Sequence, residues 1–229
     1  MGVFVDMRGM AAVLKIRYGQ SIGTSFLVAI DKRSFLFTAK HIVQDFRPGD
    51  KVALFQENTW RTLEVIKHKF CEKGNDVAVL LISASQESGL NETDMSANLV
   101  MGQDIAYCGF PLRLQMPDHD DSFGMPMPIM KSGIFSGVNE LENRAEFLFD
   151  THNNKGFSGG PIFVVDHKDK KTKIAAIVSG YKYDDPIPVL TRDENSEFVE
   201  TAEYWVRPNS GFMVGCSVAI AVDIARQMV

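Results

Sequence analysis

The chain alternates short apolar runs with polar turns, and helical periodicity is scarce before its end. The segments Gly23–Ile30 and Phe35–Phe37 predict two strands joined by a short polar turn. Asn75–Ile82 starts as a polar turn and continues as an apolar run typical of a buried strand. Near the end, Val222–Met228 predicts one or two turns of helix, with Asp223 near its positive end. The pattern as a whole predicts an all-β protein.

The segment Gly156–Pro161 has the composition of a loop that presents a nucleophile, because its glycines flank a single serine, Ser158. An activated serine needs an exposed hydroxyl on a tight turn and two backbone N–H groups aimed at the developing oxyanion. Gly156 and Ser158 can supply these donors, and glycine at position 156 permits backbone geometry closed to other residues. A non-catalytic turn rich in glycine is the alternative for this segment taken alone.

Two further segments add a histidine and an aspartate. His41 lies in Thr38–Val43, just past the end of a predicted strand, and Asp76 enters the strand of Asn75–Ile82 at its rim. Either residue alone is more commonly a hydrogen-bonded structural group. The three segments together, in the order His41, Asp76, Ser158, favour nucleophilic catalysis.

At these residues the chain resembles the chymotrypsin-like serine peptidases, whose histidine, aspartate and serine occur in that order in T-A-x-H, D-x-A-[LV] and G-x-S-G-G-P contexts. The matching segments here are Thr38–His41, Asp76–Val79 and Gly156–Pro161. The resemblance covers most of the chain. It is closer to the bacterial HtrA-like branch of trypsin-like peptidases than to the secreted digestive enzymes.

The resemblance implies one trypsin-like peptidase unit over residues 1–229, built from two antiparallel six-stranded β-barrels of the chymotrypsin type and a short C-terminal helix. We expect an N-terminal barrel at residues 10–112, a crossover loop at 113–128, a C-terminal barrel at 129–221 and the helix at 222–229. No PDZ domain is expected.

Four segments resemble particular barrel strands of that family. Ile105–Pro111 resembles the strand and turn that close the first barrel, and Lys131–Val138 resembles the first strand of the second. Ile174–Gly180 resembles the strand beside the substrate, and Gly215–Ile220 resembles the last strand.

The resemblance also implies a mechanism. His41 takes the proton of Ser158 as its hydroxyl attacks a peptide carbonyl, Asp76 holds the imidazole tautomer, and the N–H groups of Gly156 and Ser158 stabilise the oxyanion. No metal or cofactor is expected. In zymogen-activated members an aspartate before the serine pairs with a newly cut N-terminus. Phe157 stands there and cannot form that ion pair, so activation by N-terminal cleavage is not expected.

The substrate pocket is assigned by the family's spacing. His152, six residues before the serine, is expected at the pocket base where trypsin has an aspartate, with Asp150 further back, so trypsin-like preference is not expected. Ser179, Gly180 and Tyr181 are expected to pair with the substrate backbone, and the Tyr181 side chain would restrict the pocket to small apolar residues.

A long segment between Tyr181 and Ser210 exceeds the corresponding loop of HtrA-like enzymes. Its acidic residues are Asp184, Asp185, Asp193, Glu194, Glu197, Glu200 and Glu203. An acidic lid or partner-binding flap beside the cleft is one interpretation. The other is a solvated insertion that ends in a strand around residues 203–206.

Composition limits the partners and the compartment. The 229 residues are 45% hydrophobic, and the net charge of −5 with no basic patch gives no case for nucleic acid. No secretory signal is evident, and the most apolar tract, residues 212–222, is too short to span a bilayer, so no membrane partner is expected.

The three cysteines, Cys71, Cys108 and Cys216, are expected to be buried free thiols, which favours a reducing, cytoplasmic location. His119 lies in an acidic stretch that we interpret as a solvated loop, not a metal site.

The expected partner is therefore a polypeptide substrate. The alternative function is a latent or catalytically idle barrel pair that binds a peptide or protein, since a fold does not dictate its function. A latent enzyme would need a regulatory protein partner.

Overall fold

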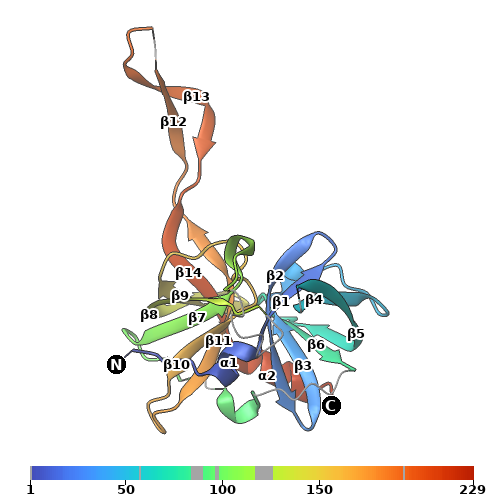
Figure 1. The fold of residues 1–229 in the computed structure, drawn as a ribbon. Coiled ribbons are helices and arrows are strands. Elements are labelled where there is room, and N and C mark those ends of the chain that lie inside the picture. Colours follow the sequence, from blue (N-terminus) through green and yellow to red (C-terminus); the bar gives the residue numbers. More distant parts are fainter. Residues whose placement is uncertain (1, 57, 84–89, 96–97, 117–125, 193) are drawn as a thin grey trace.

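The strands form two closed six-stranded antiparallel barrels, and a two-stranded ribbon projects from the second (Figure 1). These features come from a computed structural model that describes residues 2–56, 58–83, 90–95, 98–116, 126–192 and 194–229. The all-β prediction with two chymotrypsin-type barrels and a short C-terminal helix is confirmed.

The first barrel has the strand order β1-β2-β3-β6-β5-β4. Its strands are β1 (Val13–Tyr18), β2 (Ser21–Ile30), β3 (Arg33–Thr38), β4 (Lys51–Gln56), β5 (Thr59–Phe70) and β6 (Ala78–Ile82). Aromatic side chains on β2 and β3 illustrate the cross-strand packing that holds such a sheet together. Phe26 lies opposite Phe37, with an edge-to-face ring contact at 5.5 Å.

The second barrel has the strand order β10-β11-β14-β9-β8-β7. Its strands are β7 (Asp104–Gly109), β8 (Ile129–Leu141), β9 (Arg144–Asp150), β10 (Pro161–Val165), β11 (Thr172–Tyr183) and β14 (Asn209–Ser217). The ribbon, β12 (Ile187–Arg192) and β13 (Phe198–Val206), is inserted between β11 and β14.

Each barrel has its own interior, and a third cluster of buried side chains joins them. Leu36 and Leu80 pack inside the first barrel, and Phe149 and Ile162 pack inside the second. The joining cluster contains residues of both barrels and of the C-terminal helix, among them Phe26, Phe37, Cys108, Phe163, Ile177 and Val222. The two barrels therefore share buried apolar surface.

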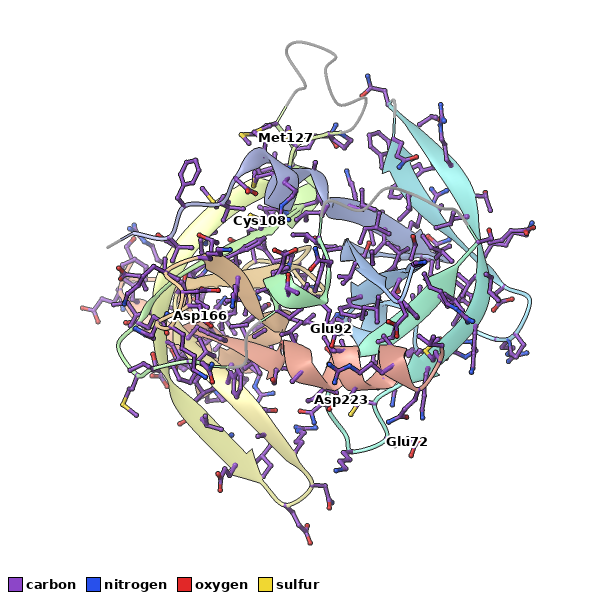
Figure 2. The ribbon with its side chains drawn as sticks, turned by 90° about the horizontal axis from the view of Figure 1, so that it is seen from below. Glu72, Glu92, Cys108, Met127, Asp166 and Asp223 are labelled. Atoms are coloured by element: carbon purple, nitrogen blue, oxygen red, sulfur yellow. The ribbon has the colours of Figure 1, made fainter. Side chains whose placement is uncertain are left out.

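Helix α2 (Val218–Arg226) lies across the base of both barrels (Figure 2). The Ser217 hydroxyl caps it by accepting the Ala219 N–H at 3.3 Å. The helix begins four residues earlier than predicted, so the expected strand Gly215–Ile220 ends at Ser217, and Asp223 lies in the second turn of the helix.

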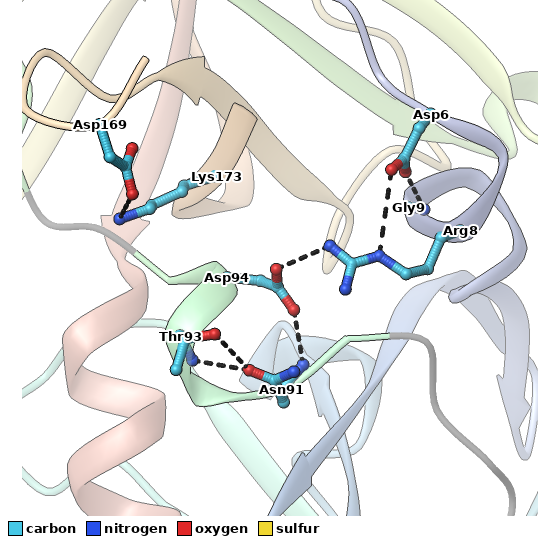
Figure 3. Close-up of polar contacts among 8 residues, drawn as sticks. All are labelled: Asp6, Arg8, Gly9, Asn91, Thr93, Asp94, Asp169 and Lys173. Atoms are coloured by element: carbon cyan, nitrogen blue, oxygen red, sulfur yellow. Dashed lines mark hydrogen bonds and ion pairs between the residues drawn. The ribbon is translucent and has the colours of Figure 1, made fainter. Parts of the chain in front are cut away.

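A short N-terminal helix, α1 (Met7–Ala11), is tied to the connection between the barrels (Figure 3). Asp6 accepts the Gly9 N–H at 2.8 Å, and Arg8 pairs with Asp94 at 2.7 Å. Asp94 belongs to a 3₁₀ turn, Glu92–Asp94, that Asn91 caps by accepting the Thr93 N–H at 2.9 Å.

The expected boundary between the barrels is wrong. β7, predicted to close the first barrel, pairs with β8 and β10 and belongs to the second. The chain therefore crosses between residues 82 and 104, and the expected crossover 113–128 joins two strands of one barrel. Part of that loop, residues 117–125 with His119, lies outside the described residues.

The cysteine prediction is confirmed, since Cys71, Cys108 and Cys216 are free and buried. In the part of the chain that the structure describes, no helix has both the length and the apolar character needed to cross a membrane.

Candidate active site

His41 is held in place by the end of a buried strand. The chain leaves β3 through the buried Ala39 and turns through a 3₁₀ helix, Lys40–Ile42. The His41 backbone N–H donates to Asp76 Oδ1 at 2.9 Å, and its Nδ1 lies 2.7 Å from Asp76 Oδ2. A proton on Nδ1 satisfies this contact, so Nε2 is left as the basic nitrogen of the neutral ring.

Asp76 precedes β6 and is held from both barrels. Besides His41 of the first barrel, the Ser179 hydroxyl on β11 donates to Asp76 Oδ2 at 2.8 Å. Burial raises the pKa of Asp76, but the hydrogen bonds and charge of His41 together with Ser179 outweigh it and hold the pKa below its usual value. The carboxylate is therefore ionised at neutral pH.

Ser158 lies on the loop between β9 and β10, and this loop is clamped between the barrels. The Ser158 carbonyl accepts the Thr24 N–H of β2 at 2.9 Å, and the Gly159 N–H donates to Val178 of β11 at 2.7 Å. Gly159 has φ +84°, and a Cβ there would overlap the Thr24 carbonyl oxygen. Only glycine satisfies both restrictions.

The two expected oxyanion donors lie on the same loop. Gly156 has φ +109°, a Cβ there would overlap the Phe110 carbonyl, and its own carbonyl accepts the Thr24 hydroxyl at 2.7 Å. Among the described residues, neither the Gly156 N–H nor the Ser158 N–H donates a hydrogen bond. Both donors are therefore available to a bound group.

The Ser158 hydroxyl itself is directed toward β11. Its Oγ donates to the Ser179 carbonyl at 3.2 Å, and within the described part of the chain it makes no hydrogen bond with His41. The structure thus places His41 and Asp76 in direct contact. Ser158 is linked to that pair through Ser179.

Phe157 occupies the position before the serine and is fully buried. Its ring contacts Tyr107 edge-to-face at 4.8 Å, and the Tyr107 hydroxyl donates to the His152 carbonyl at 3.2 Å. Aromatic packing and the Thr24 hydroxyl therefore hold the loop in place. A carboxylate paired with an N-terminus has no counterpart at this position.

The predicted pocket residues lie on two neighbouring segments. Asp150 ends β9, and the following side chain of His152 is exposed. Gly180 follows Ser179 on β11, and a Cβ at Gly180 would meet nothing within 4 Å. Tyr181 places its hydroxyl 3.3 Å from that of Tyr183, with the rings 4.9 Å apart. The substrate roles of these residues stay predictions.

Sequence reasoning named Ser179 only for substrate pairing, and it missed three supporting roles in the site. The Ser179 hydroxyl supports Asp76, and Thr24 holds the oxyanion loop. The third is Asn153, which is 1% exposed; its Nδ2 donates to the Gly180 carbonyl at 2.9 Å, while its Oδ1 has no partner among the described residues. Only the closeness of Asn153 to Ser158 along the chain could have indicated the last of these roles.

The chain belongs to the trypsin-like peptidase family. A profile described as the trypsin-like peptidase domain matches residues 23–169, a range that contains His41, Asp76 and Ser158. No curated protein matches the chain at a significant level.

Solved structures show the same fold at low sequence identity. The HtrA-type protease AlgW with tripeptide is 14% identical with a TM-score of 0.58, and the match covers 96% of this chain and 61% of that one. The MamO protease domain from Magnetospirillum magneticum is 12% identical with a TM-score of 0.55, over 95% of this chain and 97% of that one. The chain therefore spans about three fifths of the AlgW length.

Proposed function

We propose that the chain is a serine endopeptidase that hydrolyses peptide bonds through a covalent acyl-enzyme. The observation that carries this proposal is the hydrogen-bonded pair of His41 and Asp76 beside a serine loop with two uncommitted N–H donors. Family membership supports it, because a peptidase acts on polypeptides.

In this mechanism Ser158 Oγ leaves the Ser179 carbonyl and turns to His41 Nε2 when substrate binds. His41 takes the serine proton as Oγ attacks the carbonyl carbon, and then delivers it to the leaving amine. The ionised Asp76 stabilises the imidazolium formed between these steps. The N–H groups of Gly156 and Ser158 stabilise the oxyanion, an effect worth on the order of 10²–10³ in rate per donor. No step requires a metal or cofactor.

The substrate chain would lie along β11. Ser179, Gly180 and Tyr181 would pair with its backbone, and the open space beside Gly180 supports this placement. Asp150 and His152 would line the pocket for the side chain before the scissile bond. The absence of an aspartate at position 152 argues against a preference for Lys or Arg.

Covalent labelling with a fluorophosphonate probe tests the proposal. Purified wild-type protein is expected to be labelled, and Ser158→Ala and His41→Ala are expected to abolish labelling because they remove the nucleophile and its base. Ser136→Ala is a matched control, since its hydroxyl also donates to a backbone carbonyl, that of Ile134 at 3.4 Å. Absence of labelling in well-folded wild-type protein would contradict an enzyme that is active at rest.

A latent or idle scaffold is the second candidate, and one contact favours it. The Ser158 hydroxyl is engaged with the Ser179 carbonyl and not with His41. A regulatory partner that realigned this hydroxyl would convert a latent form into an active one. Labelling that appears only after a protein partner is added would identify the latent form, and labelling that never appears would identify a binding scaffold.

A cytoplasmic location remains a proposal from cysteine usage. Three buried free thiols fit a reducing compartment, where disulfides are rare.

A further inference from the structure

The β12–β13 ribbon continues the strands that border the proposed substrate site. It extends from β11 and β14, where Tyr183 pairs with Asn209 and the Asp184 N–H donates to the Pro208 carbonyl at 2.9 Å. Figure 1 shows the ribbon projecting away from both barrels. Because β11 also carries Ser179 and Gly180, a chain lying along that strand would meet the base of the ribbon.

The ribbon exposes several large apolar side chains. Six of them are more than half exposed: Ile187, Leu190, Phe198, Tyr204, Trp205 and Val206. A two-stranded hairpin is only marginally stable by itself in water, and exposed aromatic clusters mark interaction sites. Both strands of such a ribbon are also edges that can pair with a third strand.

The charge of the chain is concentrated in the same segment. Residues 184–208 contain seven acidic and two basic residues, a balance of −5 that equals the charge of the whole chain. The other 22 acidic and 22 basic residues cancel. Both basic groups of the segment lie over aromatic rings, Arg192 at 5.0 Å from the ring centre of Phe198 and Arg207 at 5.9 Å from that of Tyr183, the last residue of β11.

The negative charge of the ribbon determines which kinds of partner can bind to it. A second ribbon would bring −5 against −5, and nucleic acids and anionic lipid surfaces would be repelled in the same way. A basic chain is attracted, and its alternate apolar side chains would lie on one face of the ribbon, where they would cover either Tyr204 or Trp205.

We infer that the β12–β13 ribbon is a docking surface for an extended basic polypeptide segment of a protein substrate, which adds to its edge as a further strand. Backbone pairing supplies the register, and the exposed apolar side chains supply contact area. The acidic groups of the ribbon favour a docked segment that is rich in basic residues. The inference rests on the proposed function in so far as the docked chain is a substrate.

Fluorescence anisotropy of two labelled peptides tests the inference. One peptide alternates Lys with Val and the other alternates Glu with Val, and both are titrated with Ser158→Ala protein so that neither is cleaved. The Lys–Val peptide is expected to bind, and its affinity is expected to fall as salt is added. The Glu–Val peptide is not expected to bind. Tyr204→Ser with Trp205→Ser should weaken binding about tenfold or more.

Charge and position have matched controls. Glu200→Gln with Glu203→Gln should reduce both the affinity and its salt dependence, since both side chains are exposed. Ile66→Ser removes an apolar side chain that is 63% exposed on β5 of the first barrel, and it should leave binding unchanged.

Three results would overturn docking on the ribbon. They are equal binding of both peptides, full affinity after the Tyr204 and Trp205 substitutions, and self-association in sedimentation that those substitutions abolish. Fluorophosphonate labelling of protein with an intact Ser158 separates this inference from the enzyme proposal. Labelling without peptide binding refutes the docking surface alone, and peptide binding without labelling refutes the enzyme active at rest alone.

Discussion

Asp76 receives three hydrogen bonds on one carboxylate, two from His41 and one from Ser179. The Asp76 carboxylate is ionised, and its pKa in the folded protein lies below the value of 3.8 for a free side chain. Between those two pKa values the unfolded chain binds more protons than the folded one. Stability from this group is therefore present above about pH 4 and declines as the pH falls through the folded pKa.

Asp76→Asn tests this position in two ways. It should lower the rate of peptide hydrolysis about 10⁴-fold, because an amide can leave the proton on the wrong ring nitrogen of His41. It should also destabilise the protein at pH 7, and the difference from wild type should shrink as the pH falls below about 4. Urea unfolding across this pH range provides the measurement.

Asp184→Asn, at the exposed base of the ribbon, is the control for urea unfolding, and its free energy of unfolding should follow that of the wild type across the whole pH range. If the difference in the free energy of unfolding between Asp76→Asn and wild type stayed constant down to pH 2, it would contradict a stabilising, ionised Asp76 with a lowered pKa.

Local sequence places His41, Asp76 and Ser158 in recognisable motifs, but it does not reveal which side chains from distant parts of the chain contact them. The Ser179 hydroxyl reaches Asp76 across 103 positions of the chain, and the Thr24 hydroxyl reaches Gly156 across 132. Such contacts depend on how two barrels dock. No spacing rule along the chain can supply them.

Among the elements, α2 connects parts of the molecule that are far apart in sequence. It packs against β6 of the first barrel and β11 of the second, and the Lys69 ammonium donates to Gln227 just beyond its end at 2.7 Å. Val218, Ala221, Val222, Ile224 and Ala225 form its buried face. A helix this short depends on such packing for its stability.

Ile224→Ala should destabilise the whole protein by about 2–5 kcal/mol, because it leaves a cavity under both barrels. Asp223→Ala on the exposed face of the same helix should change the free energy of unfolding by no more than about 0.5 kcal/mol. Equilibrium urea unfolding compares the two variants. Equal effects would show that the helix is not packed as described.

The prediction errors among the elements share a physical origin. The strand at Ile105–Gly109 was evident from its apolar run, but the partner strand is set by distant pairs such as Tyr107 with Ile162. The helix start at Ser217 carried a readable signal, an N-cap residue before apolar residues at helical spacing. In the ribbon, acidic residues interrupt the apolar alternation of Phe198–Val206, so only its last residues were predicted as a strand.

At the scale of the whole molecule, the barrels are coupled by the cluster that joins them. Phe26 and Phe37 of the first barrel share it with Phe163 and Ile177 of the second, and α2 closes it from below (Figure 2). The proposed catalytic groups also come from both barrels, with His41 and Asp76 from the first and Ser158 from the second.

We therefore predict that the barrels unfold in a single transition. Trp60 reports on the first barrel once Trp205→Phe has removed the other tryptophan. In a Cys71→Ser background the thiols of Cys108 and Cys216 report on the second barrel, since burial raises the pKa of each to about 12 and protects them while folded. Fluorescence and thiol labelling should give the same urea midpoint. Thiols that react well before Trp60 changes would show independent barrels.

The uneven distribution of charge has a consequence for the physical state of the protein. The chain outside residues 184–208 carries no net charge at pH 7, and a protein surface without net charge favours association and precipitation. The projecting ribbon gives every molecule an outlying negative charge, so two molecules that approach ribbon first repel one another. The acidic segment 184–208, proposed to bind a basic partner, thus also keeps molecules of the protein from associating with one another.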